Sequence, residues 1–220
     1  MKLNTLQQLI FDMNSVFYKS IEFFIIFILI PVSYSLPYSA YLKLTLGFLG
    51  FLYIIYVLLK VEKEKFKISP HLNWNRFWKE TIIRLLLIAF LTTLFVWLND
   101  TESLFEVVIN KPAMWFKFLL IYSFFSVYPQ ELLYRTFFFK RYKMLFKSKS
   151  FFFFVNAIVF SLAHLFFKNT LVLILTFLGG LLFALTFKKT GSTLLVSIEH
   201  AIYGSWLFTV GMGGMLGFPT

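Results

Sequence analysis

The sequence has no cysteine and few charged residues, and both absences limit the class of protein that it can be. Without cysteine, disulfides and thiolate metal ligands are excluded. Charged residues make up 14% of the chain, whereas a soluble domain carries about 25%. Because 59% of the residues are hydrophobic and 32 are phenylalanine, the side chains cannot cover a water-facing surface. The composition therefore indicates an integral membrane protein.

Long apolar runs are abundant, and they predict an all-α fold. A membrane helix needs roughly 20 mostly apolar residues. Residues 1–20 carry apolar side chains at helical spacing and no signal-peptide cleavage site, so we expect an interfacial amphipathic helix there. The whole chain, 1–220, is expected to be a single membrane domain. About seven transmembrane helices are predicted, at about 21–36, 41–60, 81–99, 115–138, 151–168, 169–187 and 192–211.

Acidic residues are scarce, with 10 against 21 lysines and arginines, which gives a net charge of +11. The basic residues fall between the apolar segments, so they indicate topology and make nucleic acid an unexpected partner. With a cytoplasmic N-terminus, 15 of them lie inside, 4 lie outside, and Arg84 and Arg135 fall within predicted helices. We therefore expect a multi-pass protein whose N-terminus is cytoplasmic, whose C-terminus is outside and whose partner is membrane lipid.

Ionisable side chains inside the predicted helices are few, and each needs a reason. At bilayer depth such a group costs about 2.5–3.5 kcal/mol on insertion scales. One carboxylate and two imidazoles on three different helices point to a site, because bundles build sites from side chains on facing helices. The candidates are Glu131, Arg135, His164, Glu199 and His200.

Two other features have structural interpretations. Arg84 follows Glu80 by four residues on the same helical face, which favours an ion pair near the start of a helix. The glycine-rich stretches "FLGGLLFA" (177–184) and "VGMGGMLG" (210–217) lie in apolar segments. Small residues of this kind predict close helix packing in a membrane.

The polar residues form three short motifs in order. "QELLYR" (130–135) is followed by "FSLAH" (160–164) and "HAIYG" (200–204). They resemble the Glu-Glu-x-x-x-Arg, Phe-x-x-x-His and His-x-x-x-Asn/Asp motifs of the CPBP family. This family is named for CAAX prenyl proteases and bacteriocin-processing enzymes, and its members are also called Abi-type intramembrane proteases. The resemblance covers about residues 115–210, where it implies a CPBP-like catalytic core.

The resemblance implies an intramembrane endopeptidase that works without metal on a membrane-associated or CAAX-type prenylated peptide. Two positions depart from the family. Gln130 stands where the family has the glutamate usually taken as the base, and Gly204 stands at the asparagine or aspartate of the third motif. The family's catalytic set maps onto Glu131, His164, His200 and Arg135.

Peptide hydrolysis needs a base to activate water and donors to hold the developing oxyanion. Glu131 is a candidate base, His164 a group that orients the water, and His200 an oxyanion donor. Supporting or substitute groups are also available. The hydroxyls of Tyr203 and Ser205 are candidates to replace the missing third-motif side chain, Glu199 offers a second base, and Gln130 keeps a polar amide.

Three alternatives remain at the level of sequence. Glu131, His164 and His200 are a potential zinc site with an open position, although no His-Glu-x-x-His helix is present and no cofactor is expected. Because of Gln130 and Gly204, the chain is alternatively an inactive membrane scaffold or regulator that keeps the protease fold. A small transporter, in which the polar groups relay protons, is a further alternative.

Overall fold

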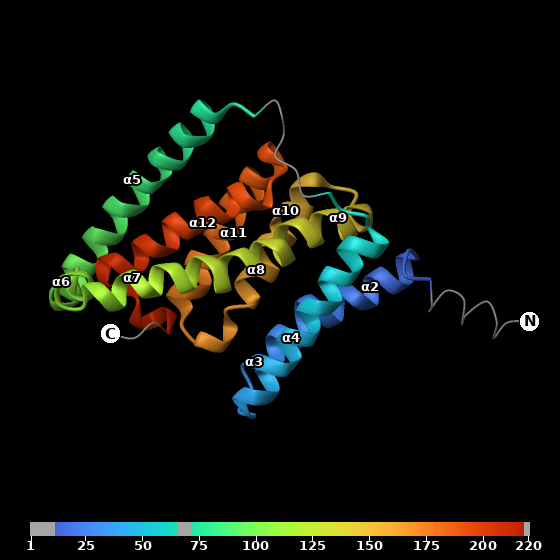
Figure 1. The fold of residues 1–220 in the computed structure, drawn as a ribbon, viewed down its shortest axis with the longest axis horizontal. Helices are drawn as coiled ribbons and strands as arrows, with labels where there is room; N and C mark the ends of the chain where they lie inside the picture. Colours follow the sequence, from blue (N-terminus) through green and yellow to red (C-terminus); the bar gives the residue numbers. More distant parts are fainter. Residues whose placement is uncertain (1–11, 66–71, 218–220) are drawn as a thin grey trace, which may run out of the picture. The chain divides into compact units, whose positions relative to one another are not determined.

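The computed structural model describes residues 12–65 and 72–217, and these residues form helices and connecting loops with no strand among them (Figure 1). All seven segments expected to be helical are helical, so the all-α membrane bundle is confirmed. Within the described residues, five helices are individually long and apolar enough to cross a membrane. They are Val16–Tyr34, Ala40–Val61, Trp74–Asn99, Lys149–Phe167 and Thr170–Thr190.

Two of these helices begin earlier than the starts predicted from their apolar runs, and each begins at a polar N-cap residue. Helix α2 (Val16–Phe24) begins after Ser15, whose hydroxyl accepts a hydrogen bond from the Tyr18 N–H. Helix α5 (Trp74–Asn99) begins after Asn73, whose side chain caps it in the same way. Of the interfacial helix expected for residues 1–20, the first 11 residues lie outside the described residues, and the last five belong to α2.

Contacts divide the chain into two compact units. Unit 1 comprises Met1–Phe66 and Leu132–Leu185, and unit 2 comprises Lys67–Glu131 and Thr186–Thr220. Two helical stretches contribute residues to both units. One is the continuous stretch 112–145, and the other is α11 (Thr170–Thr190).

Unit 1 has an aromatic core. Its helices include α4 (Ala40–Tyr56), which lies beside α2 (Figure 1), and α9 (Phe138–Tyr142). The ring of Phe27 is fully buried and meets the rings of Phe138 and Tyr142 nearly edge-on, at centroid distances of 5.3 and 5.6 Å. Edge-to-face contacts place the positive ring edge against a negative ring face. The many phenylalanines of the sequence thus form a specific core as well as a lipid-facing surface.

A close helix contact in unit 1 involves Gly180 of α11 and Ala157 of α10 (Lys149–Leu162). A Cβ added at Gly180 would lie 3.0 Å from the Ala157 Cα and 3.3 Å from its Cβ. Backbone atoms cannot move aside as side chains do, so a glycine is needed at this position. The close packing expected for 177–184 is confirmed here.

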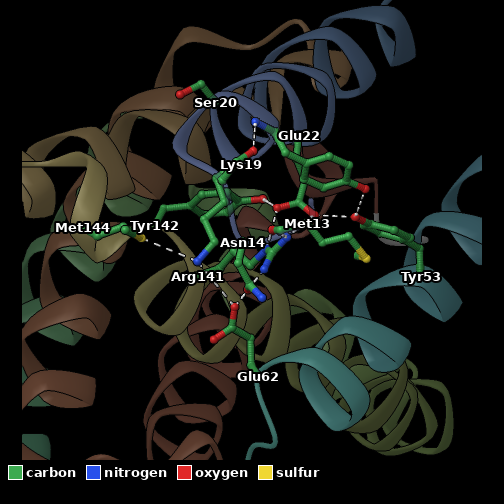
Figure 2. A network of polar contacts seen from close by, with 12 residues as sticks. Met13, Asn14, Lys19, Ser20, Glu22, Tyr53, Glu62, Arg141, Tyr142 and Met144 are labelled. Atoms are coloured by element: carbon green, nitrogen blue, oxygen red, sulfur yellow. Dashed lines mark hydrogen bonds and ion pairs between the residues drawn. The ribbon is translucent and has the colours of Figure 1, made fainter. Parts of the chain in front are cut away.

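A network of charged groups also holds unit 1 together. Figure 2 shows Arg141 pointing at Glu22 and Glu62, with nitrogen–oxygen distances of 2.7 and 2.8 Å. The Arg141 guanidinium also donates to the Met13 carbonyl, and the hydroxyl of Tyr142 donates to Glu22. Arg141 has no exposed surface. Since a buried ion needs partners for its whole donor set, this network fixes α2 and the end of η2 (Val57–Val61) against α9.

Unit 2 is arranged around α12 (Thr193–Leu207), which packs against α5, η4 (Tyr122–Val127) and α8 (Tyr128–Glu131). Indole groups tie these helices together. Trp206 donates to the Thr92 hydroxyl of α5, and Trp115 donates to the Thr209 hydroxyl, both at 2.9 Å. This packing places the third motif, on α12, against the beginning of the first motif.

Candidate functional site

The helix that carries the first motif changes its winding at the motif. Two π-helical segments, η4 and η5 (Leu132–Phe137), flank the short α8. Pro129 in α8 has no N–H to donate, and its ring crowds the carbonyl four residues earlier. A wider π turn absorbs such a defect, and π turns are frequent at functional sites. The proline of the sequence therefore accounts for the irregular helix directly before Gln130 and Glu131.

Glu131 and His200 form a direct hydrogen bond in unit 2. The His200 Nδ1 lies 2.8 Å from the Glu131 Oε1. Glu131 is fully buried, and the side chain of His200 is 9% exposed. Since an ionised carboxylate only accepts, charged Glu131 requires the hydrogen on Nδ1, which leaves Nε2 as the nitrogen that can accept a proton. The first and third motifs are therefore joined as a carboxylate–imidazole pair.

Gly204, the departure in the third motif, has a steric explanation. A Cβ added there would lie 2.5 Å from Cζ and 2.7 Å from Cε1 of Tyr122, with the Tyr122 hydroxyl closer still. The same tyrosine ring stands edge-on to His200, with a centroid distance of 6.1 Å. No side chain fits at position 204 while Tyr122 keeps this place. Sequence reasoning missed Tyr122, because a tyrosine in an apolar helix gives little signal by itself.

Gln130 uses its amide within its own helix. Its Nε2 donates to the Ser126 hydroxyl at 2.8 Å, one turn earlier. Its Oε1 is buried and has no hydrogen-bond partner within the described part of the chain. An amide does not take up a proton at neutral pH, so Gln130 is a neutral neighbour of Glu131 in the motif.

The second motif lies in unit 1. There the ring of Phe160 contacts two ionisable residues of the motifs, Arg135 and His164. The Arg135 guanidinium carbon lies 4.8 Å from the centroid of the Phe160 ring, in cation–π geometry. The His164 ring lies 5.0 Å from the same ring, centroid to centroid. The His164 Nδ1 is 2.8 Å from the Phe160 carbonyl oxygen. Because a carbonyl only accepts, this hydrogen bond places the hydrogen on Nδ1 and leaves Nε2 to accept.

Arg135 is fully buried and has a partner that the sequence did not reveal. It donates to the Asn156 Oδ1 at 2.7 Å, and the Asn156 amide donates to the Tyr134 carbonyl, also at 2.7 Å. Asn156 is itself fully buried. The signal in the sequence was a single amide inside the apolar run "FFFFVNAIVF". A buried amide of this kind needs hydrogen-bond partners, so it pins a neighbouring charged or backbone group.

Glu199 and Tyr203 form a second cluster in unit 2, together with Arg84. The Glu199 Oε1 lies 2.7 Å from the Arg84 Nη1 and 2.8 Å from the Tyr203 hydroxyl. The Tyr203 hydroxyl also lies 3.1 Å from the Thr81 carbonyl oxygen. Ser205 is half-buried, and its carbonyl accepts from a threonine hydroxyl one turn later. Glu199 and Tyr203 therefore bind Arg84 and α5, and their described contacts do not involve His200.

A cavity of ≈ 290 Å³ opens in unit 2 beside Arg84. Its charged lining is organised by Glu80, whose carboxylate accepts from Arg76, Arg84 and Lys189 at 2.9, 3.1 and 2.6 Å. The pair expected between Glu80 and Arg84 is confirmed. Threonine hydroxyls, from Thr81 and Thr186 among others, complete a polar surface that suits water or a polar ligand.

Across residues 12–65 and 72–217, no three His, Asp or Glu side chains gather as a group that could hold a metal ion. The expectation of a metal-free protein stays a prediction.

Three ordered motifs on the helices of a membrane bundle, with a carboxylate–imidazole pair between the first and the third, are similar to the motif set of CPBP-type intramembrane proteases. Comparison with protein families confirms the resemblance. Residues 112–215 match the family described as Rce1-like, type II CAAX prenyl endopeptidase Rce1-like. The match spans all three motifs. Comparison with curated proteins and with solved structures gave no match.

Proposed function

We propose that this protein is an active membrane endopeptidase that hydrolyses a peptide bond in a membrane-associated, CAAX-type prenylated peptide. The family match supplies the class of reaction and of substrate. The observation that carries the proposal is the 2.8 Å hydrogen bond between the His200 imidazole and the buried Glu131 carboxylate. Such a pair provides a base even though Gln130 stands at the position of the family's usual base.

In this proposal the pair handles the proton of the attacking water. His200 is the more exposed member, so its Nε2 takes the proton while the water oxygen bonds to the scissile carbonyl carbon. Glu131 holds the hydrogen on Nδ1 and stabilises the positive charge that develops on the ring. The proton then passes from Nε2 to the leaving amine as the carbon–nitrogen bond breaks. The base is thereby the pair rather than Glu131 alone.

Arg135 of the first motif and His164 of the second, both in unit 1, are proposed to act in the same reaction. The tautomer that the Phe160 carbonyl favours makes Nε2 the His164 nitrogen that can accept a hydrogen bond. Arg135 acts on this imidazole through Phe160, whose ring both side chains contact. Its role is therefore positioning.

The first test is the substitution Glu131→Gln in protein reconstituted into liposomes with a prenylated fluorogenic peptide. The glutamine oxygen can still accept from Nδ1, but it cannot stabilise the imidazolium. We expect kcat to fall by about 100-fold or more, as for loss of general-base catalysis. His200→Ala and His164→Ala should each give a loss of similar size.

The matched control is Glu106→Gln, because Glu106 lies in the same unit on α6 (Glu106–Asn110) with its side chain 33% exposed. This variant should keep full activity. Cleavage by Glu131→Gln at the wild-type rate would rule out the pair as the base.

A non-catalytic scaffold or regulator is the second candidate function. It is favoured by the two departures, Gln130 and Gly204. If the protein is a scaffold, we expect the wild-type protein to bind a prenylated peptide without cleaving it. Binding without turnover, measured with a non-fluorogenic labelled peptide in the same liposomes, would decide in its favour.

A further inference from the structure

We infer that Tyr122 supplies, from a different helix, the polar side chain that the third motif lacks at Gly204. The inference rests on the proposed function, because it assigns a residue to that reaction. The polar group expected at position 204, in the third motif, is supplied from position 122, which lies outside all three motifs.

The volume of the missing side chain is already filled. Position 204 follows His200 by four residues on α12, so a side chain there would project on the same face as the imidazole. Its Cβ would fall 2.5 Å from the Tyr122 Cζ and closer still to the hydroxyl. The Tyr122 hydroxyl therefore stands where the first atoms of an asparagine or aspartate side chain would otherwise be. The edge-on contact with His200 keeps the ring on that face.

The local backbone explains how a residue of another helix reaches this place. Tyr122 is the first residue of η4, the π-helical segment that precedes Pro129. At Tyr122 the regular α-helical winding therefore gives way to a π turn, a feature frequent at functional sites. The same segment packs along α12, which brings Tyr122 to Gly204.

The chemistry of the exchange is conservative. A phenol donates one hydrogen bond, as does an amide N–H. Directed at the carbonyl oxygen of the scissile bond, this donor would stabilise the negative charge that develops when water attacks. Loss of one such donor lowers kcat by about 100- to 1,000-fold in well-studied hydrolases. Tyr203, an earlier candidate for this part, has its hydroxyl 2.8 Å from Glu199 instead.

The test is Tyr122→Phe, which keeps the ring and removes only the hydroxyl. In the liposome assay we expect kcat to fall by about 100-fold, while KM changes little because the donor acts on the developing charge. Tyr128→Phe is the control, since Tyr128 lies on the same continuous helix and is 38% exposed. It should leave kcat unchanged.

A reciprocal exchange separates a chemical from a structural role. Gly204→Asn alone should lower the thermal unfolding temperature, because the new side chain overlaps Tyr122. The double variant Tyr122→Ala/Gly204→Asn should recover the unfolding temperature that Gly204→Asn loses. Its kcat should be at least tenfold higher than that of Tyr122→Ala.

Wild-type kcat in Tyr122→Phe, or wild-type thermal stability of Gly204→Asn, would overturn the assignment while the proposed function stands. An inactive wild-type protein would instead overturn the proposed function, and the assignment with it.

Discussion

Arg84 keeps a fully buried carboxylate, Glu199, in place on α12, next in sequence to His200. Its Nη1 lies 2.7 Å from the Glu199 Oε1, and the Arg84 side chain is only 20% exposed. A buried carboxylate that loses its partner is left uncompensated in a medium that solvates it poorly. At the scale of single residues, stability in unit 2 should therefore depend strongly on this arginine.

We expect Arg84→Met to lower the free energy of unfolding by about 3–5 kcal/mol, the usual cost of breaking a buried ion pair from one side. Arg76→Met is the control, because Arg76 also binds Glu80 but its side chain is 69% exposed. An exposed pair contributes about 0–1 kcal/mol. Unfolding of both variants in detergent micelles measures the difference, and equal losses would contradict the assigned burial.

Single residues also show where reading the sequence succeeds and where it stops. Glu131 and His200 stood out because ionisable groups are rare in apolar runs, and they do form a pair. Tyr122 and Asn156 did not stand out as site residues, since what they do depends on the neighbour that fills the adjacent volume. Glu199 was a candidate second base, and it binds an arginine 115 positions away in the sequence. Such partners depend on tertiary packing, and the spacing of residues along one sequence does not predict them.

At the scale of helices, apolar runs predicted the existence of each element well and its ends less well. The caps Ser15 and Asn73 lie outside the runs, so α2 and α5 extend beyond them. The π-helical segments were not expected at all. Hydrophobic patterning is similar in α- and π-helical turns over a few residues, so apolar spacing does not distinguish them.

The contact between α10 and α11 gives a prediction at this scale. Gly180→Ala places a methyl group 3.0 Å from the Ala157 Cα, so the helices must separate. We expect a loss of about 1–3 kcal/mol in the free energy of unfolding, as for other overpacked cores.

Gly50→Ala is the matched control on α4, because a Cβ there meets nothing within 4 Å. It should be neutral or stabilising by up to about 1 kcal/mol, since alanine favours a helix over glycine. A Gly180→Ala variant as stable as the Gly50→Ala variant would contradict the close contact.

At the scale of the whole molecule, the absence of cysteine makes the proposed topology directly testable. Single cysteines introduced as Thr101→Cys and Lys147→Cys fall in exposed positions between membrane helices. With the N-terminus inside, a membrane-impermeant maleimide should label the first from outside in sealed, oriented vesicles. It should label the second only after permeabilisation. The reverse pattern would show that the 15-to-4 distribution of basic residues does not set the orientation.

The network around Arg141 has a consequence for how the chain is assembled during translation. Glu22 leaves the ribosome 119 residues before Arg141, its main cationic partner. Throughout that interval the first long helix carries a carboxylate that the nascent chain cannot yet neutralise with this arginine. The amino-terminal helices therefore gain this ion pair only once α9 has been synthesised. Biogenesis of unit 1 is thus completed late, by a residue from beyond the middle of the chain.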